Sequence, residues 1–371
     1  MERVLVYGVK DPPGGVEKIV LEYVRSITAK HDLRFDLMVF GDDFSQEENY
    51  REMGCRVFCI PVRRKDPVGY NRRIAEIFEE NKYTAVWCNF AGLTNIDPLI
   101  LGKKYGVPVR IAHSHGSRLY WGSPVMKYVV AVLHALNKLR LSNYATDYWA
   151  CSDVAGQFMF PKGIQNCIKL IPNAVDTGVF YPDLEQRGRK RVELGIPEDA
   201  FVVGHVARIC EVKNQFFLLK IMVEVVRKSP SAKLLFVGDG ELNQEIRTKV
   251  HSLGLDEHVI MTGDRSDVPE LLRTMDVFVL TSFSEGLSVS AVEAQSSGIP
   301  CVLPDTVSRL TDITGNATFL SLDVPANVWA ERILEVTGIQ TENIKERVAA
   351  SGFDLSDAAE KLYQMFMGTV E

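Results

Sequence analysis

Short apolar, β-branched runs alternate along the whole chain with longer stretches of helical period. This alternation is expected of strands that feed crossover helices in a parallel sheet. At 371 residues the chain is too long for one ordinary core and fits two domains of similar size. The predicted strands lie near residues 3–8, 34–40, 56–60, 84–89, 107–113, 147–151 and 167–171, and then near 200–206, 232–237, 258–262, 276–281, 299–303 and 317–321.

The division between the two halves is predicted near Pro182. Residues 172–182 combine two prolines with Asn and Gly and show no period, as a connecting segment should. A charged stretch follows at residues 185–191, and a new strand–helix series then begins. We therefore expect two similar α/β domains, over residues 1–182 and 183–355, with a cleft between them.

Composition narrows the functional classes. The formal net charge of −6 argues against nucleic-acid binding, which needs a basic face. The seven cysteines form no C-x-x-C pair and lie mostly in apolar runs, which favours reduced thiols. The N-terminus enters a strand at once, without the pattern of a secretory signal, and no apolar run has the length of a membrane span. These features predict a cytoplasmic protein.

Two glutamates follow the apolar run at residues 276–282. Glu285 lies in a small-residue loop, and Glu293 lies one or two turns into the helix that this loop opens. Ligands of open α/β sheets bind at the carboxyl ends of the strands, so both acids are offered to one elongated ligand. Ser288 or Ser290 can cap the helix and leave its first N–H groups facing the same crevice. This arrangement favours a ligand with hydroxyl groups and negative charge, such as a sugar nucleotide.

Two cations follow the first strand of the second half. Arg208 and Lys213 lie in the loop and at the start of the next helix, where together they could neutralise a diphosphate. A pair of solvated surface cations is the alternative. Their position at a strand end, opposite the loop of Glu285, favours the diphosphate interpretation.

Two glycine-rich turns follow strands. Gly14 and Gly15 sit between the first strand and a helix, where a ligand could approach the backbone closely; a tight Pro-Pro-Gly-Gly turn explains them equally well. The turn Gly238-Asp239-Gly240 suggests a dinucleotide fingerprint. The fingerprint fails, because its third glycine would fall on Asn243.

His113 and His115 end a strand in the first half. Their spacing puts both on one strand face, but no further metal motif such as D-x-D or H-E-x-x-H is present. We expect one neutral imidazole to bond a polar substrate group and the other to pack against the sheet, with a purely structural pair as the alternative.

The stretch 125–141 is a mostly apolar helix with Lys127, Lys138 and Arg140 near its ends. Core packing is the default expectation. A membrane-surface helix is the alternative, favoured by basic clusters at residues 63–65, 72–73 and 103–104.

Together these features resemble the retaining, nucleotide-sugar-dependent glycosyltransferases of the GT-B fold, the family 4 or group 1 type that builds bacterial polysaccharides and glycolipids. The resemblance covers nearly the whole chain, and its most specific element is the E-x7-E arrangement. It also rests on residues 14–17, 171–176 with Phe180, 237–240, His115, Arg208 and Lys213. It implies two facing Rossmann-like domains with a deep cleft, and a C-terminal helix, residues 356–371, packed on the first domain. Ala174 and Ser288 depart from the family pattern, which often has glycine there.

The resemblance also implies roles for single residues. Glu285 would hold hydroxyls of the transferred sugar, Glu293 the nucleotide ribose, and Arg208 and Lys213 the diphosphate. The N–H groups near the donor would come from Gly286, Leu287 and Ser288. From the first domain Gly14, Gly15 and His115 would contact the donor, and His115, Arg208, Lys213 and Glu285 would act in catalysis.

The implied reaction moves a hexose from a UDP-type donor to a sugar or lipid-linked acceptor without a metal or other cofactor. Attack by the acceptor would occur on the face from which the diphosphate leaves. With a lipid-linked acceptor, the protein would also contact the inner face of the membrane peripherally. The rival interpretations are a sugar-nucleotide epimerase or a phosphorylase on the same scaffold, a non-catalytic sugar-nucleotide-binding subunit and a dehydrogenase.

Overall fold

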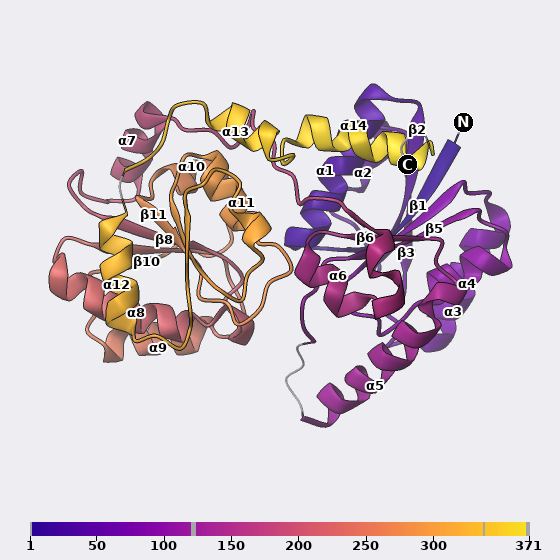
Figure 1. Ribbon diagram of the computed structural model, residues 1–371, viewed down its shortest axis with the longest axis horizontal. Coiled ribbons are helices and arrows are strands. Elements are labelled where there is room, and N and C mark those ends of the chain that lie inside the picture. Colours follow the sequence, from indigo (N-terminus) through magenta and orange to yellow (C-terminus); the bar gives the residue numbers. More distant parts are fainter. Residues whose placement is uncertain (1, 120–123, 337, 369–371) are drawn as a thin grey trace. The chain divides into compact units, whose positions relative to one another are not determined.

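The computed structural model describes residues 2–119, 124–336 and 338–368 and divides into two compact units. The first runs up to Asn173 and also contains the segment from Leu355 onward, and the second is Ala174–Asp354. In Figure 1 the first unit is mostly indigo to magenta, with one yellow helix, and the second is mostly orange.

The first unit is built on a parallel sheet. Within the described residues it has seven strands in the order β3-β2-β1-β4-β5-β6-β7. These strands are β1 (Glu2–Lys10), β2 (Leu33–Phe40), β3 (Arg56–Ile60), β4 (Ala85–Phe90), β5 (Val109–Ser114), β6 (Asp147–Ala150) and β7 (Ile168–Leu170). The helices are α1 (Gly15–Lys30), α2 (Glu47–Glu52), α3 (Pro67–Glu80), α4 (Asp97–Lys104), α5 (Pro124–Arg140), α6 (Asp153–Met159) and α14 (Leu355–Phe366).

The second unit repeats this plan. Its described residues form six parallel strands in the order β10-β9-β8-β11-β12-β13. These strands are β8 (Val202–Val206), β9 (Lys233–Val237), β10 (Val259–Met261), β11 (Val277–Val279), β12 (Cys301–Pro304) and β13 (Ala317–Leu320). The helices are α7 (Leu184–Glu193), α8 (Gln215–Lys228), α9 (Asn243–Ser252), α10 (Val268–Arg273), α11 (Val289–Ser296), α12 (Ala326–Glu335) and α13 (Ile344–Ala350).

Both sheets reverse their strand order at an equivalent place. The first reverses between β1 and β4, and the second between β8 and β11. In doubly wound sheets, ligands bind outside the carboxyl ends of the two strands at such a switch point. The fold therefore directs attention to the loops that follow β1, β4, β8 and β11.

The predicted strands are confirmed, with ends displaced by one or two residues. Central strands are buried on both faces: every residue of β4 is buried, as expected of a parallel strand covered on both sides by helices. In the second unit, one apolar cluster includes Leu218, Met222 and Trp329 from α8 and α12, and another includes Leu271 and Ala294 from α10 and α11. Helices cover both faces of this sheet, as Figure 1 shows.

The boundary between the units precedes the predicted one at Pro182. Residues just after Asn173 already bond to the second unit: the Val175 N–H donates to the Phe353 carbonyl at 2.8 Å, and Thr177 Oγ1 bonds Asp354 Oδ2 at 2.6 Å. The Arg273 guanidinium also donates to the Val179 carbonyl at 2.7 Å. The proline-rich stretch looks like a linker in sequence, but its backbone groups are bonded to the second unit.

The C-terminal helix α14 packs on α1 of the first unit. The Tyr363 ring stacks on His31 with centroids 3.7 Å apart, and Lys30 Nζ donates to Ser356 Oγ at 2.7 Å. At its far end Phe366 meets the edges of Trp87 and Trp149, 5.7 and 5.4 Å between centroids. The chain thus completes the core of its first unit with its last helix.

Helix α5 buries only a narrow side, with Val130, His134 and Asn137, so the default expectation of core packing is wrong for most of residues 125–141. It is attached through polar side chains: His134 Nδ1 accepts from the Leu93 N–H at 3.1 Å, and Asn137 Nδ2 donates to the Leu93 carbonyl at 2.8 Å. Large apolar side chains point to solvent instead: Val125, Met126, Tyr128, Val129, Val132, Leu133, Leu136 and Leu139. No helix in the described part of the chain combines the length and apolar character needed to cross a bilayer.

Candidate active site

Lys213 and Glu285 form an ion pair at the switch point of the second sheet. Lys213 ends a short 3-10 turn (Glu211–Lys213) after β8, and Glu285 lies in the loop after β11. The Lys213 ammonium contacts Glu285 Oε1, and only 20% and 15% of the two side chains are exposed. Ser282 Oγ donates to the same carboxylate oxygen at 2.9 Å. The structure therefore brings together a cation and an acid that lie in the loops after two separate strands.

The loops that carry this pair are tied to each other. Thr281 Oγ1 lies 3.1 Å from the Lys213 carbonyl and 3.0 Å from the Asn214 carbonyl, and the Phe283 N–H donates to the Val212 carbonyl at 2.9 Å. Sequence reasoning missed Thr281 and Ser282. The signal was present, because two hydroxyl residues end an otherwise apolar strand run.

Arg208 lies in the same loop as Lys213 but has a different partner. Its guanidinium pairs with Glu241 Oε2 at 2.9 Å, and 68% of its side chain is exposed. Gly238 closes the other side of this loop: a Cβ there would lie 2.3 Å from the Ala207 carbonyl oxygen, so only glycine permits the approach. Arg208 and Lys213 thus share a loop but pair with different acids. Arg208 stays open to solvent, whereas Lys213 is largely buried.

Helix α11 begins as the sequence predicted. Ser288 is the N-cap, and its Oγ accepts from the Ala291 N–H at 3.4 Å. Glu285 precedes this cap in the loop, and Glu293 lies within the helix, half-buried. Gly286 and Leu287 are buried between them. The E-x7-E arrangement therefore spans a loop and the first turns of a helix whose N-terminus is at the carboxyl end of β11.

The predicted glycine turn of the first unit also stands at a helix N-terminus. Gly14 is the N-cap of α1, and Gly15 is the first helical residue. A Cβ on Gly14 would lie 2.8 Å from Glu17 Oε2, and Lys10 Nζ lies 3.4 Å from Glu17 Oε1. A tight turn and a ligand-facing loop both fit this geometry, so the donor contact of these glycines stays a prediction.

His113 and His115 are both buried, with ring centroids 4.0 Å apart. Trp87 Nε1 can only donate, so the His113 Nδ1 that it meets at 3.1 Å is the acceptor, and the His113 proton lies on Nε2. Asn89 donates its amide to the Tyr7 carbonyl at 3.3 Å, which turns its Oδ1 toward His115 Nε2 at 2.9 Å. His115 therefore carries its proton on Nε2.

Burial decides the charge of this pair. Desolvation lowers the pKa of His115 to about 3 and holds the pKa of His113 well below its usual value, so both rings are neutral near pH 7. His115 Nδ1 is a buried acceptor without a hydrogen-bond partner among the described residues. Across the same residues, no three His, Cys, Asp or Glu side chains gather as a metal site. The chemistry offered by His115 is thus a neutral acceptor.

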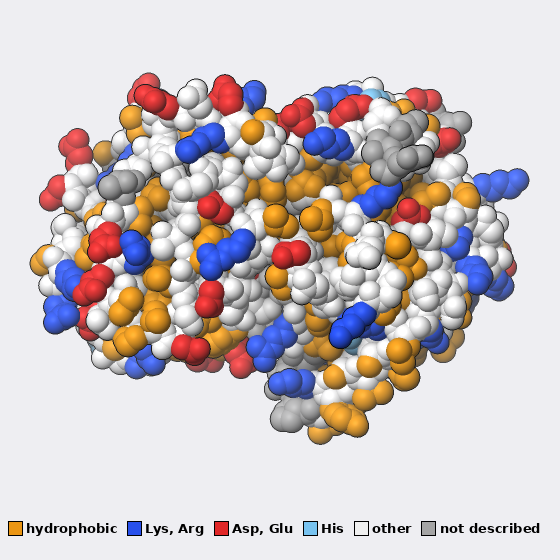
Figure 2. Space-filling model, in the orientation of Figure 1, with side chains coloured by type: hydrophobic (Ala, Val, Ile, Leu, Met, Phe, Trp, Pro, Cys, Tyr) orange, Lys and Arg blue, Asp and Glu red, His pale blue; other side chains and the backbone are white. Residues whose placement is uncertain are grey.

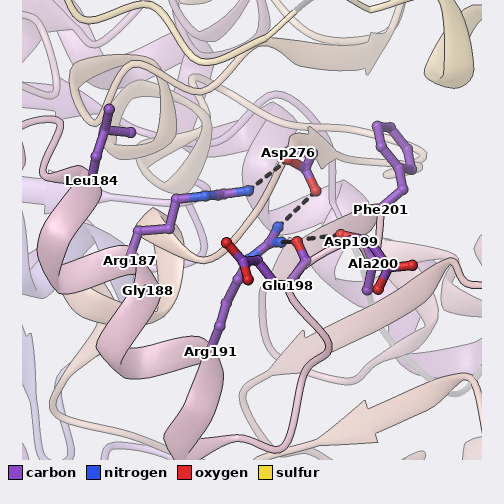
Figure 3. A pocket seen from close by; sticks show the side chains of 9 residues that line it. All are labelled: Leu184, Arg187, Gly188, Arg191, Glu198, Asp199, Ala200, Phe201 and Asp276. Carbon is purple, nitrogen blue, oxygen red and sulfur yellow. Dashed lines mark hydrogen bonds and ion pairs between the residues drawn. The ribbon is translucent and has the colours of Figure 1, made fainter.

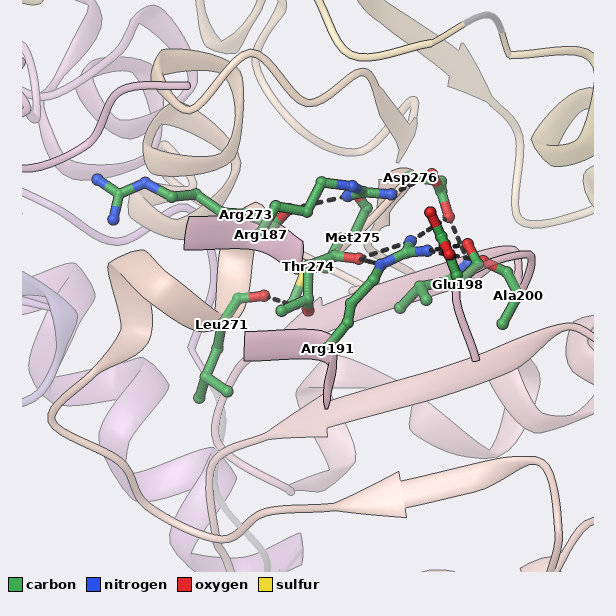
Figure 4. Close-up of polar contacts among 10 residues, drawn as sticks. Arg187, Arg191, Glu198, Ala200, Leu271, Arg273, Thr274, Met275 and Asp276 are labelled. Atoms are coloured by element: carbon green, nitrogen blue, oxygen red, sulfur yellow. Dashed lines mark hydrogen bonds and ion pairs between the residues drawn. The ribbon is translucent and has the colours of Figure 1, made fainter. Parts of the chain in front are cut away.

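A surface cavity of about 440 Å³ lies in the second unit, lined by residues near the amino ends of β8 and β11 (Figure 3). The Arg191 guanidinium donates five hydrogen bonds there, to the carbonyls of Thr274, Glu198 and Ala200 and to the Asp276 carboxylate (Figure 4). Arg187 similarly bonds two carbonyls and Asp276. All five N–H donors of Arg191 and three of those of Arg187 are thus paired within the unit, which gives these residues a structural role. The cavity lies at the amino ends of the strands, whereas Lys213 lies at their carboxyl ends.

Comparisons with known proteins bear on the family of this chain. Residues 186–347 match the family model described as glycosyl transferases group 1. A glycosyltransferase named EpsF from Bacillus subtilis (strain 168) is 33% identical over 350 residues, 92% of this chain and 90% of that protein.

Two further proteins extend the comparison. A UDP-Gal:alpha-D-GlcNAc-diphosphoundecaprenol alpha-1,3-galactosyltransferase of Escherichia coli is 26% identical over 55% of this chain and 54% of its own length. The crystal structure of Anabaena HepE in complex with UDP and glucose aligns with a TM-score of 0.79 at 18% identity, covering 99% of this chain and 100% of HepE. This chain belongs to the group 1 glycosyltransferases and has their GT-B type of fold, two Rossmann-like α/β units.

Proposed function

We propose that this chain is a retaining, metal-independent hexosyltransferase that uses a UDP-linked sugar and acts in polysaccharide or glycolipid biosynthesis. The observation that carries the proposal is the Lys213–Glu285 ion pair at the β8–β11 switch point. An ammonium has three N–H donors, and the contact with Glu285 leaves donors for a second anion. A diphosphate is the anion that a sugar nucleotide would bring.

Positive charge at this place would serve the chemical step. When the bond between the anomeric carbon and the phosphate breaks, negative charge grows on the departing diphosphate. Lys213, held by Glu285, and the solvent-open Arg208 would stabilise that charge without reorganising. Arg208 can exchange its exposed pair with Glu241 for phosphate oxygens, because surface ion pairs contribute little stability.

The acids and the helix terminus would orient the rest of the donor. Glu285 has lone pairs beyond those used by Lys213 and Ser282, and these can accept from sugar hydroxyls. Glu293 would hold the ribose, and the N–H groups near Gly286, Leu287 and Ser288 would face the donor. The N-terminus of α11 adds partial positive charge beside the diphosphate.

The first unit would contribute neutral groups. His115 would accept a hydrogen bond from a hydroxyl group through Nδ1. Gly14 and Gly15 would allow the sugar nucleotide to approach the backbone closely. Both roles follow from the resemblance. The names of the relatives support the donor and acceptor classes: HepE was crystallised with UDP and glucose, and the Escherichia coli relative is named for UDP-Gal and a diphosphoundecaprenol acceptor.

The test is turnover by the isolated chain. A panel of nucleotide sugars is first screened for thermal stabilisation, since ligands of the native state raise apparent stability. The selected donor is then incubated with a lipid extract or an oligosaccharide pool, and free UDP, glycosylated product and anomeric configuration are measured. A binding subunit would be stabilised but would form no product, an epimerase would interconvert the donors without releasing UDP, and inverted product would refute retention.

We also propose that α5 places the first unit on the cytoplasmic membrane face. Its apolar face is turned outward, and Figure 2 shows hydrophobic side chains gathered along it. Residues 116–146 contain no Asp or Glu but four bases, in a chain of net charge −6: Arg118, Lys127, Lys138 and Arg140. An apolar face bordered by cations is the pattern of a helix that lies on an anionic lipid surface.

Vesicle sedimentation tests this surface. The chain should pellet with vesicles containing phosphatidylglycerol and less with pure phosphatidylcholine. Leu136→Ser with Leu139→Ser should weaken binding to both, and Lys127→Glu mainly binding to the anionic vesicles. Val192→Ser removes an equally exposed apolar residue from α7 and serves as the control. Unchanged pelleting of the α5 variants, or self-association that they abolish, would contradict the membrane assignment.

A further inference from the structure

His205 and Gln215 form a buried hydrogen-bonded link directly beneath the loop of Arg208 and Lys213. His205 is the penultimate residue of β8, and Gln215 is the first residue of α8; the two side chains are 0% and 1% exposed. Neither residue belongs to the charged motif that the sequence suggested. Both lie where the carboxyl ends of β8 and β11 part at the switch point.

One tautomer of His205 satisfies every contact. The Val279 carbonyl can only accept, so His205 Nδ1, 2.9 Å away, must carry the proton. His205 Nε2 is then an acceptor for Gln215 Nε2, at 3.3 Å. The same Gln215 nitrogen donates to the Arg208 carbonyl at 2.9 Å. An amide NH₂ has two hydrogens, one for each of these acceptors.

The link extends the pairing of two strands to a loop. In the pairing of β8 with β11, Val203 and Gly204 lie opposite Val277 and Phe278, and the His205 ring bonds the next carbonyl, that of Val279. Through Gln215, this ring also fixes the orientation of the Arg208 peptide. Burial lowers the pKa of His205 to about 4, so the ring stays neutral and keeps its acceptor lone pair near pH 7.

We infer that His205 and Gln215 are positioning residues, which hold the Arg208–Lys213 loop in the conformation that binds a diphosphate. The inference rests on the proposed use of these cations by the donor. It assigns a function to two buried polar groups that packing alone does not require, since apolar residues would fill the same space. The link acts through the Arg208 backbone and touches no substrate.

Binding of UDP and of uridine separates positioning from general destabilisation. Asparagine at position 205 can still donate to Val279 but offers no acceptor at the place of Nε2. We expect His205→Asn to weaken UDP binding on the order of tenfold, the range of one lost hydrogen bond, and to leave uridine binding unchanged. Calorimetry measures UDP, and NMR titration measures uridine.

The structure offers a matched control. His258 also donates from Nδ1 to a carbonyl, that of Ala232, at 2.9 Å, but near the amino ends of β9 and β10. His258→Asn should change neither affinity. Lys213→Ala should weaken UDP binding strongly; if it does not, the proposed diphosphate site fails. If Lys213→Ala weakens UDP binding but His205→Asn and His258→Asn have the same UDP affinity, only the positioning role fails.

Gln215→Glu provides a second, pH-dependent test. A carboxylate repels the unprotonated His205 Nε2 and the Arg208 carbonyl, so UDP binding should weaken at pH 8. A neighbouring carboxylate also raises the pKa of the imidazole, and a protonated His205 can donate to it. The loss relative to the native chain should therefore shrink at pH 6. A loss that is absent, or equal at both pH values, would overturn the inference.

Discussion

At the carboxyl ends of β8 and β11 in the second sheet the key side chains are charged and partly open to solvent, whereas at those of β4 and β5 in the first sheet they are neutral and buried. Lys213 and Glu285 pair beside β8 and β11, while His115 bonds Asn89 between β4 and β5. Six strands follow the same order in both units, and the first sheet adds β7 at one edge. The shared topology thus carries charged groups at one place and neutral groups at the other.

The largest expected effect comes from breaking the charged pair. Lys213→Ala removes a charge that would stabilise the leaving diphosphate, so sugar transfer should fall by on the order of 10²–10³-fold. Measured kcat and KM for the donor check this. Lys228→Ala removes a lysine of a surface pair with Glu331 in the same unit and should leave transfer unchanged. Equal rates for both variants would remove Lys213 from the mechanism.

Arg208 should matter less than Lys213, because its side chain is exposed and must leave Glu241 to act. We expect Arg208→Ala to lower kcat/KM for the donor by roughly 10- to 100-fold. Glu241→Gln should change it by no more than about threefold, since an exposed pair contributes under about 1 kcal/mol. A large loss in Glu241→Gln would show that the acid itself acts in the site.

His115→Gln should distinguish the role of the first unit from that of the second. Glutamine retains a polar group but not the buried Nδ1 acceptor, so we expect turnover to fall on the order of tenfold, the range of one hydrogen bond, with UDP affinity unchanged. Calorimetry with UDP and a transfer assay measure the two effects. A matching loss of UDP affinity would place His115 at the nucleotide and contradict the division of labour.

The last prediction concerns acid stability, and its sign follows from the depressed pKa of His115. Buried His115 has a folded-state pKa of about 3, so below pH 6.5 the unfolded chain takes up a proton that the folded chain does not. The contribution of His115 to folding stability is fully present above pH 6.5 and is lost as the pH falls toward 3. The free energy of unfolding should decline by up to about 1.4 kcal/mol per pH unit for this residue.

Chemical unfolding at several pH values checks this slope. His115→Gln should show a shallower decline than the native chain between pH 6.5 and 4. An unchanged slope would mean that His115 titrates normally in the folded protein.

Much of the fold was predictable, because short apolar runs and helical periods are local properties. All of the predicted strand positions and the cap at Ser288 are confirmed. The pairing of Lys213 with Glu285 was only suggested, since strand order sets which loops meet. Helix α5 was predicted, but its default core packing was wrong for most of its surface, because apolar content alone does not tell which face of a helix finds a partner.

The sequence by itself determined the α/β class, the strand positions and the residues offered at strand ends, since hydrophobic periodicity acts over a few residues. Only the tertiary structure decided which of these residues pair and which stay open. Lys213 meets Glu285, Arg208 meets Glu241, and the His205–Gln215 link lies beneath both cations. The two ion pairs join residues far apart in the chain, and they exist only once the sheet has set the order of its strands.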